Sequence, residues 1–165
     1  MIVVADAGPI LHLHWIGCLS WGLPPTRIHV VEQVWIEITQ HAPQALADPR
    51  LEREAVIEMD LALQAKFSLQ SGETAAIAFA LRQPASLLLT DDAAARRACA
   101  SVGLAAVGTI GLILEAARSK RVRVDEALRA LEQLPNKGRL YVTPELLEQE
   151  VDCGSARTRV PVARR

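Results

Sequence analysis

The stretch that decides the fold is residues 1–12, MIVVADAGPILH. Its β-branched run at 2–4 is typical of a buried strand, and Pro9 opens an apolar pattern typical of a helix. One carboxylate, Asp6, lies between the two elements. A strand that ends in a Gly-Pro turn needs no charge there. Asp6 is therefore either a cap for the helix or the first member of a site whose other members lie far along the chain.

The composition of the chain fits one small domain with an aliphatic core. The chain has 165 residues, of which 50% are hydrophobic and only 4% aromatic. Its net charge of −1 gives no overall positive potential that would indicate a nucleic-acid partner. We expect one domain over residues 1–151, followed by a basic, flexible tail over 152–165. The arginines of that tail are Arg157, Arg159, Arg164 and Arg165.

The cysteines and the hydropathy pattern predict a cytoplasmic protein. Cys18, Cys99 and Cys153 are widely spaced and form no CxxC pair, which favours a reducing compartment. We find no signal-peptide pattern at the N-terminus. No apolar run reaches the roughly 18 residues that a membrane span requires. We therefore expect no association with a membrane.

Strand-like and helix-like patterns alternate along the chain. Such alternation predicts an α/β fold with a mostly parallel sheet flanked by helices. The predicted strands are 2–5, 27–31, 86–90 and 104–108. The predicted helices are 9–19, 32–41, 51–66, 70–82, 91–103, 109–121, 124–135 and a last one that starts at Pro144.

Several acids follow the predicted strands. Parallel sheets carry their chemistry beyond the carboxyl ends of the strands, so the residues just past each strand are the candidates for a site. Asp6 follows the first strand, and Asp91 and Asp92 follow the third. Glu37 lies in the helix after the second strand, and Glu73 lies in the first turn of a later helix. We expect these carboxylates to meet at one edge of the sheet.

Such a cluster suits a hard divalent cation. Carboxylates within about 6 Å of one another repel, and a cation offsets that repulsion. No histidine or cysteine stands at a matching place, which favours Mg²⁺ or Mn²⁺ over zinc. One or two such ions can activate a water and neutralise a phosphodiester. Taken singly, Asp92 could be an N-cap, Glu73 a partner of a helix dipole and Glu37 part of a solvated face.

Five segments resemble PIN-domain proteins, and more closely the branch of predicted nucleases related to VapC toxins. The similarity runs in order from residue 2 to about 151. It implies a three-layer α/β sandwich with a central, mostly parallel sheet, and metal-dependent cleavage of RNA phosphodiesters by a toxin of a toxin–antitoxin pair. The segments are VVADAGPILHLHWIGCL, VVEQVWIEI, LQSGETAAIAFAL, LLLTDDAAARRACASVGLAAVGTIGLILEAARSKRV and RLYVTPELLEQEV.

The resemblance assigns roles to particular acids. Asp6, Glu37, Glu73 and Asp92 match the catalytic, metal-binding quartet, and Asp91 is a neighbouring ligand or a substitute for Asp92. The implied cofactor is Mg²⁺ or Mn²⁺, and the implied substrate is RNA. The apolar first helices would suit a homodimer or an interface with an antitoxin protein.

Two positions depart from the family pattern. Gly8 stands where many PIN sequences have a hydroxyl residue, and Ala75 stands where relatives commonly have another acid. They motivate a second hypothesis, in which the chain is a weakly active or inactive module that binds a nucleic acid or a protein partner. A phosphatase with an aspartate nucleophile is a third reading, but its usual Asp-x-Asp motif is replaced here by Asp6-Ala7-Gly8.

Basic residues near the acids could guide a phosphate backbone. Arg96 and Arg97 follow Asp92 closely, and we predict that they line the path of a nucleic acid. The alternative is a solvated helix face. His12 and His14 are two residues apart on a predicted helix, so they point to different faces and form a poor metal pair.

Overall fold

The computed structural model describes residues 1–55, 60–83, 86–138 and 140. Its centre is a five-stranded sheet in the order β3-β2-β1-β4-β5, and every neighbouring pair is parallel. The predicted α/β class with a parallel sheet is therefore confirmed. The strands are β1 (Ile2–Ala5), β2 (Ile28–Val31), β3 (Leu51–Glu54), β4 (Ser86–Leu89) and β5 (Ala105–Val107).

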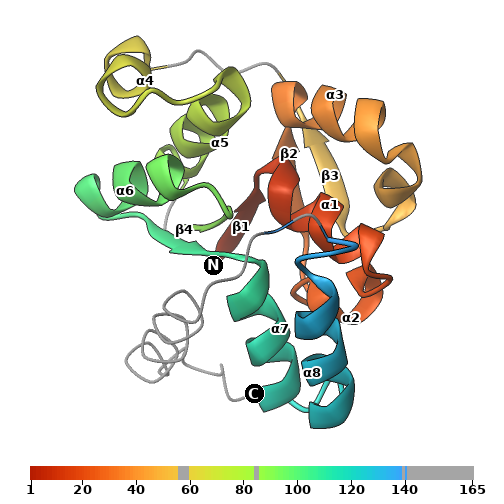
Figure 1. The fold of residues 1–165 in the computed structure, drawn as a ribbon. Coiled ribbons are helices and arrows are strands. Elements are labelled where there is room, and N and C mark those ends of the chain that lie inside the picture. Colours follow the sequence, from red (N-terminus) through yellow and green to blue (C-terminus); the bar gives the residue numbers. More distant parts are fainter. Residues whose placement is uncertain (56–59, 84–85, 139, 141–165) are drawn as a thin grey trace, which may run out of the picture.

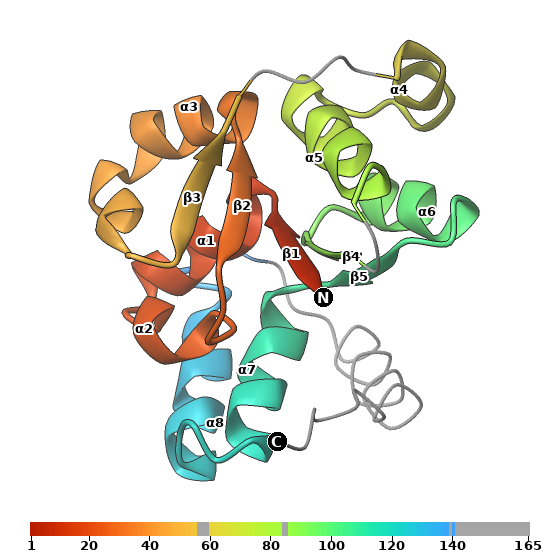
Figure 2. The ribbon, with the colours of Figure 1, turned by 180° about the vertical axis from the view of Figure 1, so that it is seen from behind.

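Helices cover both faces of the sheet. Helices α4, α5 and α6 gather on one side, where α5 packs on β1, β2 and β4, and the others gather on the opposite side (Figures 1 and 2). This is the three-layer sandwich that the sequence predicts. The helices are α1 (Ala7–Trp15), α2 (Leu19–Gly22), α3 (Glu32–His41), α4 (Leu61–Phe67), α5 (Ser71–Leu81), α6 (Ala93–Ser101), α7 (Thr109–Arg118) and α8 (Val124–Gln133), with a 3₁₀ turn, η1, at Pro43–Ala47.

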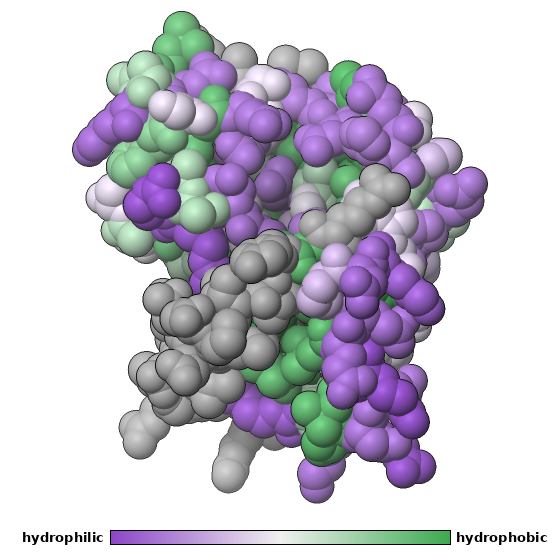
Figure 3. Space-filling view, in the orientation of Figure 1, coloured by the Kyte–Doolittle hydropathy of each residue, from purple (hydrophilic) through white to green (hydrophobic). Residues whose placement is uncertain are grey.

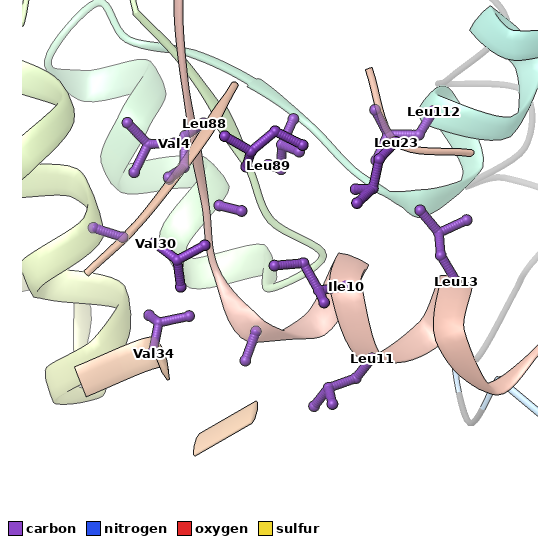
Figure 4. Packing of buried hydrophobic residues seen from close by; sticks show 14 of the residues in the cluster. Val4, Ile10, Leu11, Leu13, Leu23, Val30, Val34, Leu88, Leu89 and Leu112 are labelled. Carbon is purple, nitrogen blue, oxygen red and sulfur yellow. The ribbon is translucent and has the colours of Figure 1, made fainter. Parts of the chain in front are cut away.

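The core is aliphatic and centres on β1. Val3, Val4 and Ala5 are buried, as the unbroken apolar run of a central parallel strand requires. Figure 4 shows Val4 beside Leu88 of β4, with Ile10 of α1 packed beneath the strands. None of the helices in the described residues is long and apolar enough to cross a bilayer. On the surface seen in Figure 3, hydrophilic side chains predominate, with apolar areas between them.

Two predicted elements differ from the structure. The helix predicted over 9–19 starts two residues earlier, at Ala7, and ends at Trp15. Gly17 has a φ of +72°, which ends the helix, and the separate helix α2 follows. The helix predicted over 51–66 is wrong in its first part, because Leu51–Glu54 is the edge strand β3 and the helix α4 begins only at Leu61.

Pairing and charge explain the missed strand. Residues of β3 pair in register with β2, so that Glu52 lies opposite His29 and Glu54 opposite Val31. Arg53 points to the other face, where it forms an ion pair with Glu32 and lies over the ring of Trp35. A sequence of four residues with three charges has no strand-like apolar alternation, and charged side chains are common on edge strands. The predicted helix from Pro144 and the tail over 152–165 lie outside the described residues.

Two arginines hold the segment between α1 and β2. Arg50 donates to the carbonyl oxygens of Leu19 and Leu23 at 2.9 and 3.1 Å and to Asp48 at 2.6 Å. Arg121 also donates to the carbonyl oxygen of Leu23, at 2.7 Å. Hydrogen bonds from Arg50 hold the pKa of Asp48 below its ordinary value. This clamp provides donors for the carbonyl oxygen of Leu23, the C-cap residue of α2, whose carbonyl group lies beyond the bonds of the helix.

We predict that Arg50→Met lowers the free energy of unfolding by about 3 kcal/mol, because it removes the guanidinium that pairs with the buried Asp48 carboxylate and leaves that charge uncompensated. Arg27→Met is the matched control. Arg27 also forms an ion pair, with Glu52, but its side chain is 71% exposed, and exposed pairs contribute about 0–1 kcal/mol. Urea unfolding of both variants measures the difference. Equal losses in the two variants would contradict the role of the clamp.

Candidate active site

The candidate site lies at the carboxyl ends of the strands (called here the carboxyl edge of the sheet), between the two strands at which the strand order reverses. β1 is followed by its neighbour β2 on one side and pairs with β4 on the other. The region just beyond the carboxyl ends of β1 and β4 is therefore the topological switch point, where open parallel sheets bind ligands. Asp6 follows β1 directly, and Thr90, Asp91 and Asp92 follow β4.

Asp6 is buried at this switch point. Its residue is 8% exposed, and its backbone N–H donates to the carbonyl oxygen of Leu89 at 2.9 Å. Asp6 occupies the N-cap position of α1, but its side chain makes no capping hydrogen bond. Of the two roles that the sequence left open for Asp6, capping is therefore not the one that its side chain performs.

Thr90 joins Asp6 to Asp92. Its buried hydroxyl donates to Asp6 Oδ2 at 3.2 Å and accepts the backbone N–H of Asp92 at 3.2 Å. Asp92 is the N-cap of α6, where its Oδ1 accepts the N–H of Ala95 at 2.7 Å. The capping role considered for Asp92 is thus real, and it occupies one of the two carboxylate oxygens.

Glu37 and Glu73 come from two helices that meet above this edge. Glu37 lies in the middle of α3, which packs on α5, and Glu73 lies in the first turn of α5. A Cβ placed on Gly72 would be 3.7 Å from Glu37 Oε2, so the glutamate reaches the start of α5. Glu73 Oε2 accepts the backbone N–H of Gln70 at 2.8 Å, as in a capping box.

The electrostatics show that these acids influence one another. The pKa of Asp6 is raised to about 7, mainly by burial and also by the negative charges of Glu73 and Glu37, against lowering by the Ala7 N–H and the Thr90 hydroxyl. The pKa of Glu73 is also raised, mainly by burial and then by the charges of Asp92 and Glu37. The structure therefore brings Asp6, Glu37, Glu73 and Asp92 into one electrostatic group.

The carboxylates of this quartet are not tightly grouped. Among the described residues, no three of its carboxylates have ligand atoms within 4.8 Å of one another. The group that does meet this spacing is His29, Glu52 and Glu54 on β2 and β3. There His29 Nδ1 lies 2.6 Å from Glu54 Oε1, and Glu52 pairs with Arg27 at 3.1 Å. We interpret this second group as a His29–Glu54 hydrogen bond and an Arg27–Glu52 ion pair on the edge strand β3 and its neighbour β2.

Asp91 faces away from the quartet. Its Oδ1 accepts the backbone N–H of Thr109 at 2.7 Å, and its Oδ2 accepts the Thr109 hydroxyl at 2.5 Å. The same Oδ2 lies 2.7 Å from His12 Nδ1. Asp91 thus connects β4 to α7 and α1, whereas its neighbour Asp92 turns to α6.

The predicted basic residues occupy different environments. Arg97 is exposed on α6, and Arg96 is half-buried, with its Nη1 2.9 Å from the place that a Cβ on Gly108 would take. Three other arginines, along the α7–α8 turn, have local partners. Arg118 pairs with Glu115, Arg123 with Asp125, and Arg121 with backbone carbonyl groups. Arg97 is therefore better placed than these three to meet a ligand.

Sequence reasoning missed three residues that support this edge. Thr90, His12 and Thr109 carry the hydrogen bonds that orient Asp6, Asp91 and Asp92. A signal was present for Thr90, because a hydroxyl residue directly before two acids at the end of a buried strand can bond to both sides. No local signal exists for Thr109, which is 18 residues from Asp91.

The fold and this edge define a class: small α/β domains that gather carboxylates at the carboxyl end of a parallel sheet. Comparison with known protein families matches residues 2–152 to the PIN domain. The chain belongs to the PIN-domain family, whose members are generally nucleases that use divalent metal ions. No curated protein and no solved structure matches the chain.

The residues present fit a divalent cation. The donors are carboxylate oxygens, which hard cations prefer. The raised pKa of Asp6 shows that the group tolerates its own negative charge poorly, and a cation would remove that cost. Asp6, Glu37, Glu73 and Asp92 are the residues that could hold it.

We predict that Asp6 makes the metal-free protein less stable as the pH rises. The pKa of Asp6 is raised from 3.8 to about 7 in the folded state, so its favourable contribution is fully present below about pH 4 and is lost as the pH rises through about 7. Asp6→Asn should match the wild type at pH 4 and exceed its stability at pH 8. The gain should be at most about 4 kcal/mol, from roughly three pK units.

Urea unfolding in the presence of a chelator, at pH 4, 6 and 8, measures this effect. The difference between the two proteins isolates Asp6 from the other acids. A difference that stays the same at all three pH values would show that the Asp6 carboxyl is not shifted.

Proposed function

We propose that the chain is a metal-dependent ribonuclease that hydrolyses RNA phosphodiesters. The observation that carries the proposal is the buried carboxylate of Asp6, whose pKa is about 7 because of burial and the charges of Glu73 and Glu37. A carboxylate kept in such surroundings is costly, and costly ionisable groups concentrate at functional sites. Membership of the PIN-domain family supports nuclease-type hydrolysis.

The residues of the quartet would hold Mg²⁺ or Mn²⁺ in this proposal. When bound, a divalent cation supplies a water of lowered pKa and neutralises charge on the phosphodiester. Asp6 would give up its proton on cation binding, because the positive charge would lower its pKa. The Thr90 hydroxyl holds Asp6 Oδ2, and the cap on α6 holds Asp92 Oδ1, so both side chains are oriented before a ligand arrives. Arg97, which is exposed on α6, would contact an RNA phosphate.

A weakly active or inactive binding module is the second candidate. Two observations favour it: Ala75, where relatives commonly carry an acid, is fully buried, and Glu73 uses one oxygen in a capping box. The spacing of the quartet points the same way, since no three of its carboxylates have ligand atoms within 4.8 Å. Such a module would keep the fold and bind RNA or a protein without cleaving it.

The biological setting is proposed from the family resemblance. We infer that the chain acts in the cytoplasm as the toxin of a toxin–antitoxin pair, and that it forms a homodimer and binds an antitoxin protein. Cys18 and Cys99 are buried free thiols, and burial raises the pKa of each to about 11, which suits a reducing compartment.

We predict that the wild type cleaves RNA when Mn²⁺ or Mg²⁺ is added and that Asp6→Asn loses at least about 100-fold in rate, or roughly 2.7 kcal/mol of transition-state stabilisation. Glu132→Gln on α8 is the control, because it removes an exposed acid that lies outside the quartet. Gel analysis of a labelled RNA, with and without chelator, gives the rates.

Equal cleavage by wild type and Asp6→Asn would remove Asp6 from the mechanism. Absence of cleavage by the wild type, together with RNA binding, would favour the binding module. Thermal unfolding of each variant shows whether a lost activity reflects a lost fold.

A further inference from the structure

Asp91 is the acid of this edge that the quartet does not use. Its side chain is 11% exposed, and that of its partner His12 is 14% exposed. Both carboxylate oxygens are engaged: Oδ1 by the N–H of Thr109, and Oδ2 by the Thr109 hydroxyl and the His12 ring. Three hydrogen bonds at 2.5 to 2.7 Å occupy most of the positions at which a carboxylate can accept.

These bonds tie together three elements that are distant in sequence. Asp91 follows β4, His12 lies in α1, and Thr109 is the first residue of α7. α1 is also the helix that Asp6 precedes, and Asp91 stands between Thr90, which bonds to Asp6, and Asp92. A movement of Asp91 would therefore reach both Asp6 and Asp92.

The N-terminus of α7 has room for the carboxylate of Asp91. Its N-cap residue is Gly108, which has no side chain to cap the helix. A Cβ at that position would be only 2.6 Å from Asp91 Oδ1, so glycine leaves room for the carboxylate to approach. The φ of Gly108 is −98°, which any residue adopts, so close approach and not backbone strain is what requires glycine here. The carboxylate also complements the positive end of the helix dipole.

We propose that Asp91 is a positioning residue for the metal site and not one of its ligands, and that it acts through Thr109 and His12 to hold the ends of β1 and β4 in register. The inference rests on the proposed function, because it concerns the site at which that function takes place. It assigns different roles to two adjacent acids: Asp92 belongs to the quartet, and Asp91 fixes the frame around it.

The test is Mn²⁺ affinity, measured by calorimetry on the full chain without RNA. Thr109→Val removes only a hydroxyl and should weaken Mn²⁺ binding about tenfold, and His12→Ala should act likewise. Asp91→Asn should weaken it about 10- to 100-fold, the usual effect of losing a residue that orients metal ligands. The double variant Asp91→Asn with Thr109→Val should be no weaker than Asp91→Asn alone, because both changes break one network. Thr109→Ser, which keeps the hydroxyl, should restore wild-type affinity.

Asp48→Asn is the matched control. The Asp48 side chain is 8% exposed and hydrogen-bonded to Arg50. Asp48 precedes β3, however, and so lies at the amino-terminal ends of the strands, opposite to the acids. It should lower stability and leave Mn²⁺ affinity within twofold of wild type.

Two results would overturn the inference. If Asp91→Asn abolishes Mn²⁺ binding while Thr109→Val and His12→Ala bind as wild type does, Asp91 is a ligand. If all three variants lose stability but bind Mn²⁺ within twofold of wild type, Asp91 has a merely structural role. The predicted pattern of Mn²⁺ affinities without RNA cleavage would contradict the proposed function alone, and a wild type that binds no Mn²⁺ would contradict both.

Discussion

The burial of one carboxylate, Asp6, is the constraint on which the rest of this edge depends. An acid at the end of the central strand loses most of its hydration, and its pKa rises to about 7 as a result. Such a group is tolerated only if its surroundings compensate for the lost water. Here the Thr90 hydroxyl and the Ala7 N–H compensate in part, while Glu37 and Glu73 add to the cost. The chain itself therefore compensates only in part for the lost hydration of Asp6, as expected of a site that binds a cation.

The sheet order turns this local cost into a site. Because β1 lies between β2 and β4, the segments that follow β1 and β4 end side by side, and the helices that carry Glu37 and Glu73 meet above them. The clamp formed by Arg50 and Arg121 holds the α2 segment by its backbone carbonyl groups. Arg50 precedes β3 and so lies at the amino-terminal ends of the strands, whereas the acids lie at the carboxyl ends. The contacts that hold the α2 segment are therefore separate from the candidate site.

The sequence predicts much of this arrangement and fails for identifiable reasons. Short apolar runs are sufficient to find β1, β2, β4 and β5, and the rule for parallel sheets is sufficient to bring the acids to one end of the sheet. The strand β3 is missed because Leu51–Glu54 is mostly charged, and its conformation follows from pairing with β2. Asp91 and Asp92 are indistinguishable in sequence. Their directions differ only because Thr109 and His12, which are distant along the chain, engage one of them and α6 engages the other.

The quartet is proposed to bind a divalent cation, and proton release on binding tests this proposal most directly. Mn²⁺ can be titrated into the wild type at pH 7 in two buffers of different ionisation enthalpy. With the pKa of Asp6 at about 7, the account predicts saturable binding that releases on the order of half a proton per ion. Asp6→Asn should release fewer protons and bind more weakly. Absence of Mn²⁺ binding at millimolar concentration, or binding that releases no proton, would contradict the account.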